Sequence, residues 1–131
     1  MQFIGYRRCS TCRSILDLLR QKNVAVNVRD LKQDPPTADE IRAWHEASGL
    51  DIGRFYNTSG LSYRNGNIKE RRASLTLDEQ YALLGSDPML VKRPILVDGE
   101  TVLVGADVRR FAEAADAPKR RVVTPGKSAG K

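Results

Sequence analysis

The sequence predicts an α/β domain in which a β-α-β unit is followed by a helical block and then by a β-β-α unit. Three observations support this order. Residues 24–30 alternate between apolar and polar side chains as a strand does, and apolar residues between 10 and 22 recur at helical spacing. Farther along, two β-rich runs flank Asp98-Gly99, a strong hairpin signal. The length of 131 residues suits a single domain.

The first unit is expected to begin with a short strand at residues 2–6, QFIGY. The helix of residues 10–22 follows, and a second strand occupies residues 24–30. Lys22 and Asn23 mark the end of the helix, because a cation suits a helix C-terminus and Asn tolerates left-handed backbone. This arrangement puts a Cys-x-x-Cys pair at the start of the helix.

The central block is predicted to contain two helices with clear start signals. Thr37 is a favourable N-cap, and Glu40 three residues later completes a capping box for a helix that ends at Gly49. Thr76 and Glu79 repeat this pattern at the start of a later helix, TLDEQYALLGS.

The last unit contains the hairpin, within RPILVDGETVLVG, and a closing amphipathic helix at ADVRRFAEAA. The chain then becomes basic: its last thirteen residues carry five positive charges and no acid, out of a net charge of +6. The rest of the chain is close to neutral, so nucleic-acid binding is not expected of the domain. The tail is expected to be a solvated, disordered end; contact with RNA or an acidic protein is the alternative.

Composition places the protein among soluble globular domains, with 40% hydrophobic and 29% charged residues. Two cysteines are too few for a secreted disulfide framework. Neither a signal peptide nor a run of about 20 apolar residues is visible. We therefore expect a cytoplasmic protein without membrane contact and, because its body is small and nearly neutral, a monomer.

The two cysteines lie together in a basic segment, RRCSTCRS, at residues 7–14. The thiolate is the reactive form of cysteine, and a helix N-terminus stabilises it through free amides and a partial positive charge. Cys9 lies just ahead of the predicted helix, and Cys12 lies one turn into it, within reach for a disulfide. The spacing supplies a nucleophile, Cys9, and a resolving thiol, Cys12.

Two other interpretations of the pair remain. A zinc site needs four ligands, but His45 is the only histidine and no further cysteine exists, so carboxylates or a second copy would have to complete it. Alternatively the pair is inert, with Cys12 packed beneath the helix. His45 itself is expected to pack at the surface or half-buried rather than act as a base. No metal and no bound cofactor are predicted.

Three segments in this order resemble the arsenate reductase-like (ArsC/Spx) branch of the thioredoxin superfamily: CSTC after a strand, FYNTSGLSYR, and MLVKRPILVDGETVLVG. This branch includes glutaredoxin-linked arsenate reductases and the Spx transcriptional regulators. The resemblance implies a thioredoxin-like domain with a mixed sheet over residues 1–116. A helical insertion at about 33–91 would separate its two halves, and the basic tail would cover 117–131.

The resemblance also implies roles for particular residues. Cys9 falls at the family's nucleophilic cysteine. Cys12 stands where the regulators have Cys and the glutaredoxin-linked reductases have Ser. Arg93 and Pro94 match an Arg-Pro motif, which implies a cis peptide bond beside the active site and an arginine that faces an anionic substrate or the thiolate. A trans proline at the start of a strand is the alternative.

One departure concerns the arginines with which arsenate-reducing members are expected to bind the oxyanion. By the resemblance, two of their positions fall near Asn57 and Gly105, and neither of these residues is charged. Arg54 or Arg64 could substitute for the missing arginines. Asn57 belongs to NTSG, which forms either a polar pocket wall near the thiols, with Asn57 binding substrate, or a turn. The missing arginines and the presence of Cys12 both favour disulfide exchange over arsenate reduction.

The expected function is therefore that of a thiol-disulfide oxidoreductase or thiol-dependent reductase. Glutathione with glutaredoxin, or thioredoxin, would return the protein to its dithiol form. Two alternatives remain: an Spx-like redox-sensing regulator that binds the α subunit of RNA polymerase, and a glutaredoxin-linked arsenate reductase.

Overall fold

The computed structural model describes residues 1–115 of the chain. Its elements, with η for a 3-10 helix, are β1 (Gln2–Gly5), α1 (Ser10–Gln21), β2 (Asn27–Asp30), α2 (Ala38–Ser48), η1 (Ile52–Phe55), α3 (Leu61–Asn65), α4 (Ile68–Ala73), α5 (Leu77–Ser86), η2 (Pro88–Leu90), β3 (Ile95–Asp98), β4 (Thr101–Val104) and α6 (Ala106–Ala114). This is the predicted order of units. The predicted tail at 117–131 lies outside the described residues.

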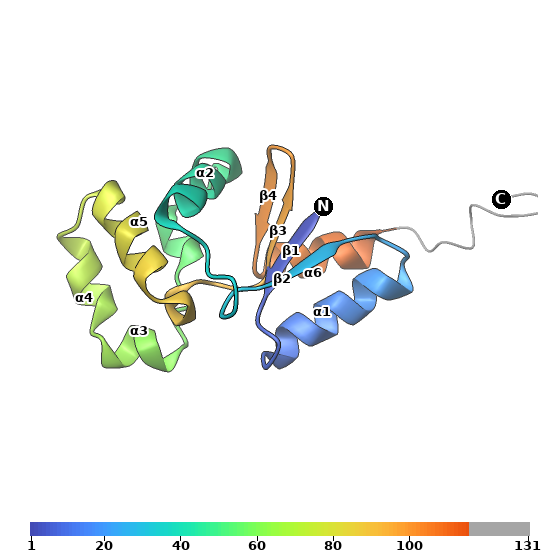
Figure 1. Ribbon diagram of the computed structural model, residues 1–131, viewed down its shortest axis with the longest axis horizontal. Helices are drawn as coiled ribbons and strands as arrows, with labels where there is room; N and C mark the ends of the chain where they lie inside the picture. The colour runs from blue at the N-terminus through green and yellow to red at the C-terminus, as the bar shows by residue number, and fades with distance from the viewer. Residues whose placement is uncertain (116–131) are drawn as a thin grey trace, which may run out of the picture.

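The four strands form one mixed sheet in the order β2-β1-β3-β4 (Figure 1). β1 runs parallel to β2 and antiparallel to β3, and β3 and β4 form the hairpin. The sequence signal at Asp98-Gly99 placed the two central residues of the hairpin turn one residue too early. Asp98 pairs with Thr101, so the turn residues are Gly99 and Glu100. Gly99 has a φ of +61°, which a type II′ turn requires at its first central residue.

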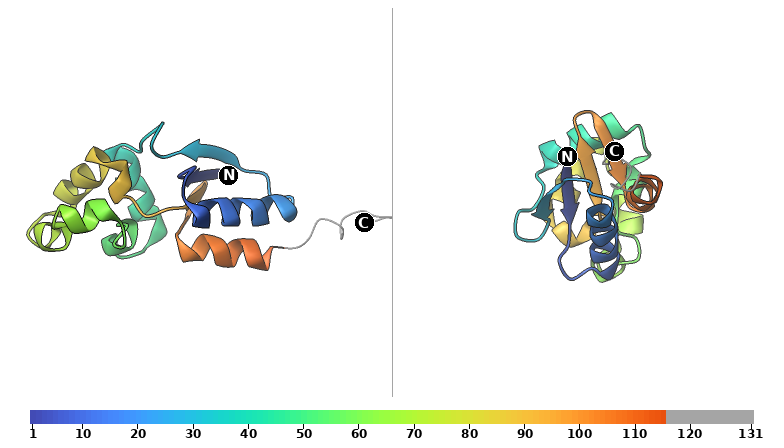
Figure 2. Two further views of the ribbon diagram at one scale, coloured as in Figure 1. Left: turned by 90° about the horizontal axis from the view of Figure 1, so that it is seen from below. Right: turned by 90° about the vertical axis from the view of Figure 1, so that its right-hand side faces the viewer.

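The sheet separates two hydrophobic clusters, because side chains along a strand alternate between its faces. Phe3 and Leu96 pair across β1 and β3 and pack in one cluster with residues of α1 and α6. Figure 2 shows these two helices side by side. Ile4 and Ile95 belong to the other cluster, which includes side chains of the helical block. The cysteine-bearing helix and the block thus cover opposite faces.

The helical block extends beyond one end of the sheet (Figure 1). Both predicted capping boxes are present, at the starts of α2 and α5. The short helices α3 and α4 were not predicted. Five and six residues are too few for a helical period to show, and each of these helices buries one large side chain, Tyr63 or Ile68. His45 is half-buried, and its Nδ1 lies 2.6 Å from the Tyr81 hydroxyl, as expected of a packing residue.

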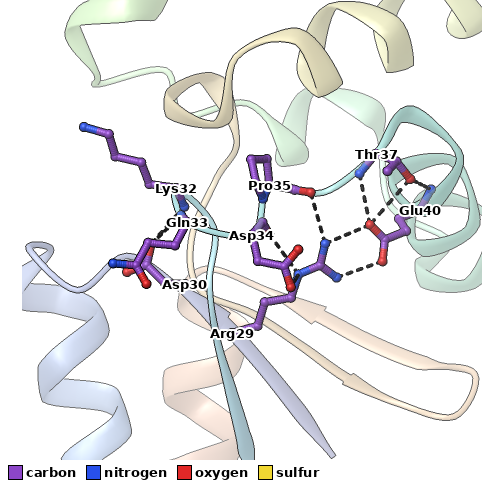
Figure 3. A network of polar contacts seen from close by, with 8 residues as sticks. All are labelled: Arg29, Asp30, Lys32, Gln33, Asp34, Pro35, Thr37 and Glu40. Carbon is purple, nitrogen blue, oxygen red and sulfur yellow. Dashed lines mark hydrogen bonds and ion pairs between the residues drawn. The ribbon is translucent and has the colours of Figure 1, made fainter.

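An ion pair holds the crossover from β2 into α2 (Figure 3). The Arg29 guanidinium donates two hydrogen bonds to the Glu40 carboxylate, at 2.7 and 2.9 Å, and two more to the carbonyls of Asp34 and Pro35. Glu40 also accepts the Thr37 amide as part of the capping box. The hydrogen bonds from Arg29 are the main cause that lowers the pKa of Glu40 to about 2, and they outweigh burial, which acts to raise it. One carboxylate therefore joins the sheet to the helical block.

Candidate active site

Cys9 is the N-cap residue of α1. Its backbone is extended, and its Sγ accepts a hydrogen bond from the Cys12 amide at 3.4 Å. The side chain is half-buried, so reagents can reach the sulfur. A sulfur at this position meets a free amide of the first helical turn, where the helix dipole favours negative charge. This environment suits a cysteine that acts as a nucleophile or as a leaving group.

Cys12 lies beside Cys9 but is buried in the cluster beneath α1. Burial is the main cause that raises the pKa of Cys12 to about 12, and the contact of Cys12 with the Cys9 side chain adds to this effect. The neighbouring charge of Arg93 acts in the opposite direction. At neutral pH Cys12 is therefore a protonated thiol next to an accessible sulfur.

Asp30, at the end of β2, fixes the loop that carries Cys9. Its Oδ2 accepts the Arg7 amide at 3.1 Å, two residues before Cys9. Although burial opposes it, hydrogen bonds from the amides of Gln33 and Arg7 lower the pKa of the Asp30 carboxyl. Sequence reasoning missed this residue. The available signal was the position of Asp30 at the end of the second strand. Because β2 runs parallel to β1, its last residue lies beside the last residue of β1, where the cysteine loop begins, and Asp30 pairs there with Gly5.

The Arg93–Pro94 peptide bond is cis, as the resemblance implied. The Arg93 guanidinium donates to the Met89 carbonyl at 2.9 Å and to a second backbone carbonyl, and it lies 5.6 Å from the centre of the Tyr6 ring. These contacts hold its charge close enough to affect Cys12. That Arg93 and Pro94 contact a substrate stays a prediction.

Asn57 lies in a turn. Its backbone amide donates to the Leu90 carbonyl at 2.7 Å, and its side-chain nitrogen lies 2.6 Å from where a Cβ on Gly60 would be. The side chain thus packs on its own turn. Substrate binding by Asn57 stays a prediction without support from these contacts.

The two candidate substitutes for the missing arginines already have partners. Arg54 forms an ion pair with Asp107 at 2.7 Å, and Arg64 donates to the Ser59 carbonyl at 3.4 Å. A cation that the sequence reasoning overlooked, Lys92, contacts one of the two positions, Gly105. The Lys92 side chain packs against Gly105, with its Cε 3.0 Å from the place of a Cβ there. Only the fold reveals this contact.

A cleft of about 440 Å³ lies beside Cys12, between α1 and β2. Its lining includes three arginines from α1 and the cysteine loop: Arg7, Arg13 and Arg20. Among residues 1–115, no group of three or more His, Cys, Asp or Glu side chains is placed to hold a metal ion. Within the same residues, no helix has the length and apolar character needed to cross a bilayer.

Comparison with known proteins places these features in a family. The model of the ArsC family matches residues 4–114. The chain is 42% identical over 113 residues to the uncharacterized protein YusI of Bacillus subtilis, which covers 86% of this chain and 96% of that protein. It is 26% identical over 106 residues to the global transcriptional regulator Spx of Staphylococcus aureus, or 79% of each chain.

Solved structures agree. An ArsC family related protein from Bacteroides fragilis superposes with a TM-score of 0.80 at 36% identity, over 86% of this chain and 94% of that one. A "possible arsenate reductase" from Streptococcus mutans superposes with a TM-score of 0.73 at 43% identity, over 78% and 86% of the two chains. The resemblance seen in the three sequence segments is thus confirmed. The chain belongs to the ArsC family, and its mixed four-stranded sheet with flanking helices is the thioredoxin-like fold of that family.

Proposed function

We propose that the protein is a thiol-disulfide oxidoreductase in which Cys9 is the nucleophile and Cys12 the resolving thiol. One observation supports this most strongly. The half-exposed Cys9 sulfur sits at the N-cap of α1 and accepts the amide of Cys12, whose own thiol is buried beside it. The pair therefore combines an accessible sulfur with a protected partner in reach.

The proposed reaction has two steps. The Cys9 thiolate attacks one sulfur of a substrate disulfide, so that a Cys9–substrate bond forms and the other substrate sulfur leaves as a thiolate. Cys12 then gives its proton to that thiolate and attacks the Cys9 sulfur, which forms the Cys9–Cys12 disulfide and releases the second substrate sulfur as a thiolate. Two electrons pass to the substrate. Glutathione with glutaredoxin, or thioredoxin, restores the dithiol.

The cationic side chains around the site are arranged in a way that suits disulfide exchange better than arsenate reduction. A doubly charged oxyanion needs several guanidinium groups that are free to bind it. Two guanidinium hydrogen bonds of Arg93 go to backbone carbonyls, and Arg54 is paired with Asp107. Lys92 adds charge near Gly105 but lacks the planar fork of arginine.

Turnover of a small disulfide, such as hydroxyethyl disulfide, by two single variants tests the proposal. Cys9→Ser should lose turnover, and Cys12→Ser should accumulate a mixed disulfide on Cys9 that mass spectrometry detects. Cys9→Ser with undiminished turnover would show the proposal to be wrong.

A second candidate function is a redox-switched regulator, favoured by the similarity to Spx. The resemblance also implies that the regulators have a cysteine at the position of Cys12. In this role the cysteine pair senses oxidation, and the partner is the α subunit of RNA polymerase. Affinity capture with that subunit, for oxidised and reduced protein, tests this candidate. Absence of capture in both states argues against it.

A further inference from the structure

Two neighbouring clefts meet at the loop that carries Cys9. One, of about 440 Å³, lies between α1 and β2, and the other, of about 360 Å³, lies beside the loop. Arg7 and Asp30 line both clefts, so the two form one continuous surface. We call it the basic surface, because it carries five exposed cationic side chains: Arg7, Arg8, Arg13, Arg20 and Lys32.

Little negative charge lies among these cations. Within the residues that the structure describes, Asp30 is the only acid that lines the two clefts. Its carboxylate oxygens already accept the amides of Arg7, Lys32 and Gln33. Among residues 1–115, no ion pair joins any of the five cations to a carboxylate. Asp17, the one acid of α1, lines a separate depression. The basic surface therefore has a positive potential that a partner's carboxylates can neutralise.

The cations on α1 follow the helix away from Cys9. Arg13 lies four residues after Cys9, and Arg20 lies seven residues after Arg13, so the three share one face of the helix. The Arg13 guanidinium also donates to the Arg7 carbonyl at 3.2 Å, which holds it against the cysteine loop. At a rise of about 1.5 Å per residue, the row extends ~16 Å from Cys9. An extended peptide of about five residues covers that length.

The kind of partner follows from what lies along this row. Val28, on the edge strand β2, is 52% exposed and lines the larger cleft together with Leu16. An exposed apolar side chain with cations around it suits a protein surface, whose interfaces combine an apolar centre with a polar rim. The row also begins at the accessible sulfur of Cys9. A protein can offer a sulfur to that cysteine, whereas a nucleic acid cannot.

We propose that the basic surface binds substrate proteins whose disulfide lies among acidic residues, within about five positions of the cysteine that Cys9 attacks. The inference rests on the proposed function, because Cys9 attacks the bound disulfide in the step already given; it adds which disulfides are selected. Carboxylates of the substrate pair with Arg13 and Arg20 while the substrate sulfur meets Cys9. Charge complementarity of this kind acts mainly by speeding the encounter of the two partners.

Two peptides that differ only in charge test this inference. Each has one cysteine activated as a pyridyl disulfide, with alternating glutamate and alanine around it in one peptide and alternating lysine and alanine in the other. The Cys9 thiolate attacks the peptide sulfur, which forms the Cys9–peptide disulfide and expels thiopyridine, whose absorbance gives the rate. Each rate is divided by the rate of the same peptide with 2-mercaptoethanol, so that intrinsic differences in reactivity cancel.

We expect the acidic peptide to react about tenfold faster than the basic peptide at low ionic strength. The difference should nearly vanish near 1 M salt, where charges are screened beyond about 3 Å. Equal normalised rates at low salt, or a faster reaction of the basic peptide, overturn this inference alone. Release of thiopyridine by Cys9→Ser at the rate of the wild type would instead remove the proposed function, and the inference with it.

A pair of variants locates the effect. Arg20 is exposed and lies near the end of α1, so Arg20→Gln should spare the fold. We expect it to reduce the preference for the acidic peptide about two- to threefold. Arg71→Gln, the same change at an exposed position on α4, is the matched control and should leave the preference unchanged. An unchanged preference in Arg20→Gln, or an equal loss in both variants, contradicts binding at the basic surface.

Nucleic acid is the competing occupant of a cationic surface. Fluorescence anisotropy with the full chain compares a mixed-sequence oligonucleotide with the acidic peptide lacking the pyridyl group. We expect Arg20→Gln to weaken binding of the peptide more than binding of the oligonucleotide. The opposite result, a greater loss for the oligonucleotide, would assign the surface to nucleic acid and overturn the inference.

Discussion

The ion pair between Arg29 and Glu40 makes a quantitative prediction about stability. Glu40→Gln removes the charge but keeps the size of the side chain, and glutamine can still accept the Thr37 amide in the capping box. The pKa of Glu40 falls from 4.5 to about 2 on folding. If the whole change in pKa contributed to the free energy of unfolding, at ~1.4 kcal/mol per pKa unit, the contribution would be ~3 kcal/mol. The Glu40 side chain is 38% exposed, so solvent screens the pair, and we expect a loss of ~1–2 kcal/mol at pH 7.

The sign of the pH dependence follows from the lowered pKa. A carboxylate of this kind stabilises the fold fully above its unfolded value of about 4.5, and its contribution disappears as the pH falls through about 2. The difference between the wild type and Glu40→Gln should therefore be constant from pH 6 to 7 and shrink from pH 5 to 2.

Urea unfolding, followed by circular dichroism at several pH values, measures this difference. Glu46→Gln is a matched control, because Glu46 is an exposed acid on the same helix, and it should stay within about 0.5 kcal/mol of the wild type. The reasoning fails if Glu40→Gln is as stable as the control at pH 7, or if its deficit persists unchanged at pH 2.

Two further predictions concern the cysteine loop. At pH 7, iodoacetamide should label Cys12→Ser at least about tenfold faster than Cys9→Ser, because the remaining thiol in the latter is buried and has a raised pKa; equal rates by mass spectrometry would contradict this. Asp30→Asn should weaken the hold on the loop, since the carboxylate accepts the amides of Arg7, Lys32 and Gln33. Hydrogen exchange of these amides should accelerate about tenfold, and unchanged exchange would speak against an anchoring role.

Local signals in the sequence predicted most of the framework. The capping boxes at Thr37 and Thr76 start α2 and α5 because a hydroxyl and a carboxylate three residues apart satisfy free amides without tertiary help. The hairpin was predicted too, but its turn lies at Gly99 and Glu100, since the pairing of β3 with β4 decides the register. The helices α3 and α4 depend on burial within the block, which a single sequence does not display.

The candidate site was predictable to a similar extent. The cysteine pair stood out because its spacing is local and its helix start could be inferred. Asp30 and Lys92 did not, since strand pairing brings Asp30 beside Gly5, and the return of the chain through the hairpin brings Lys92 beside Gly105. Arg54 seemed available as a cation until the fold paired it with Asp107. The chemical type of each residue can be read from the sequence, whereas the residues that it contacts are decided by the topology of the fold.

Mild oxidation of the full chain, followed by peptide mapping, examines the cysteine chemistry most directly. The N-cap position of Cys9 beside a buried thiol predicts one product in which the chain has lost two hydrogens and Cys9 is joined to Cys12. Two thiols that both remain free and open to alkylation after the same treatment would contradict the account.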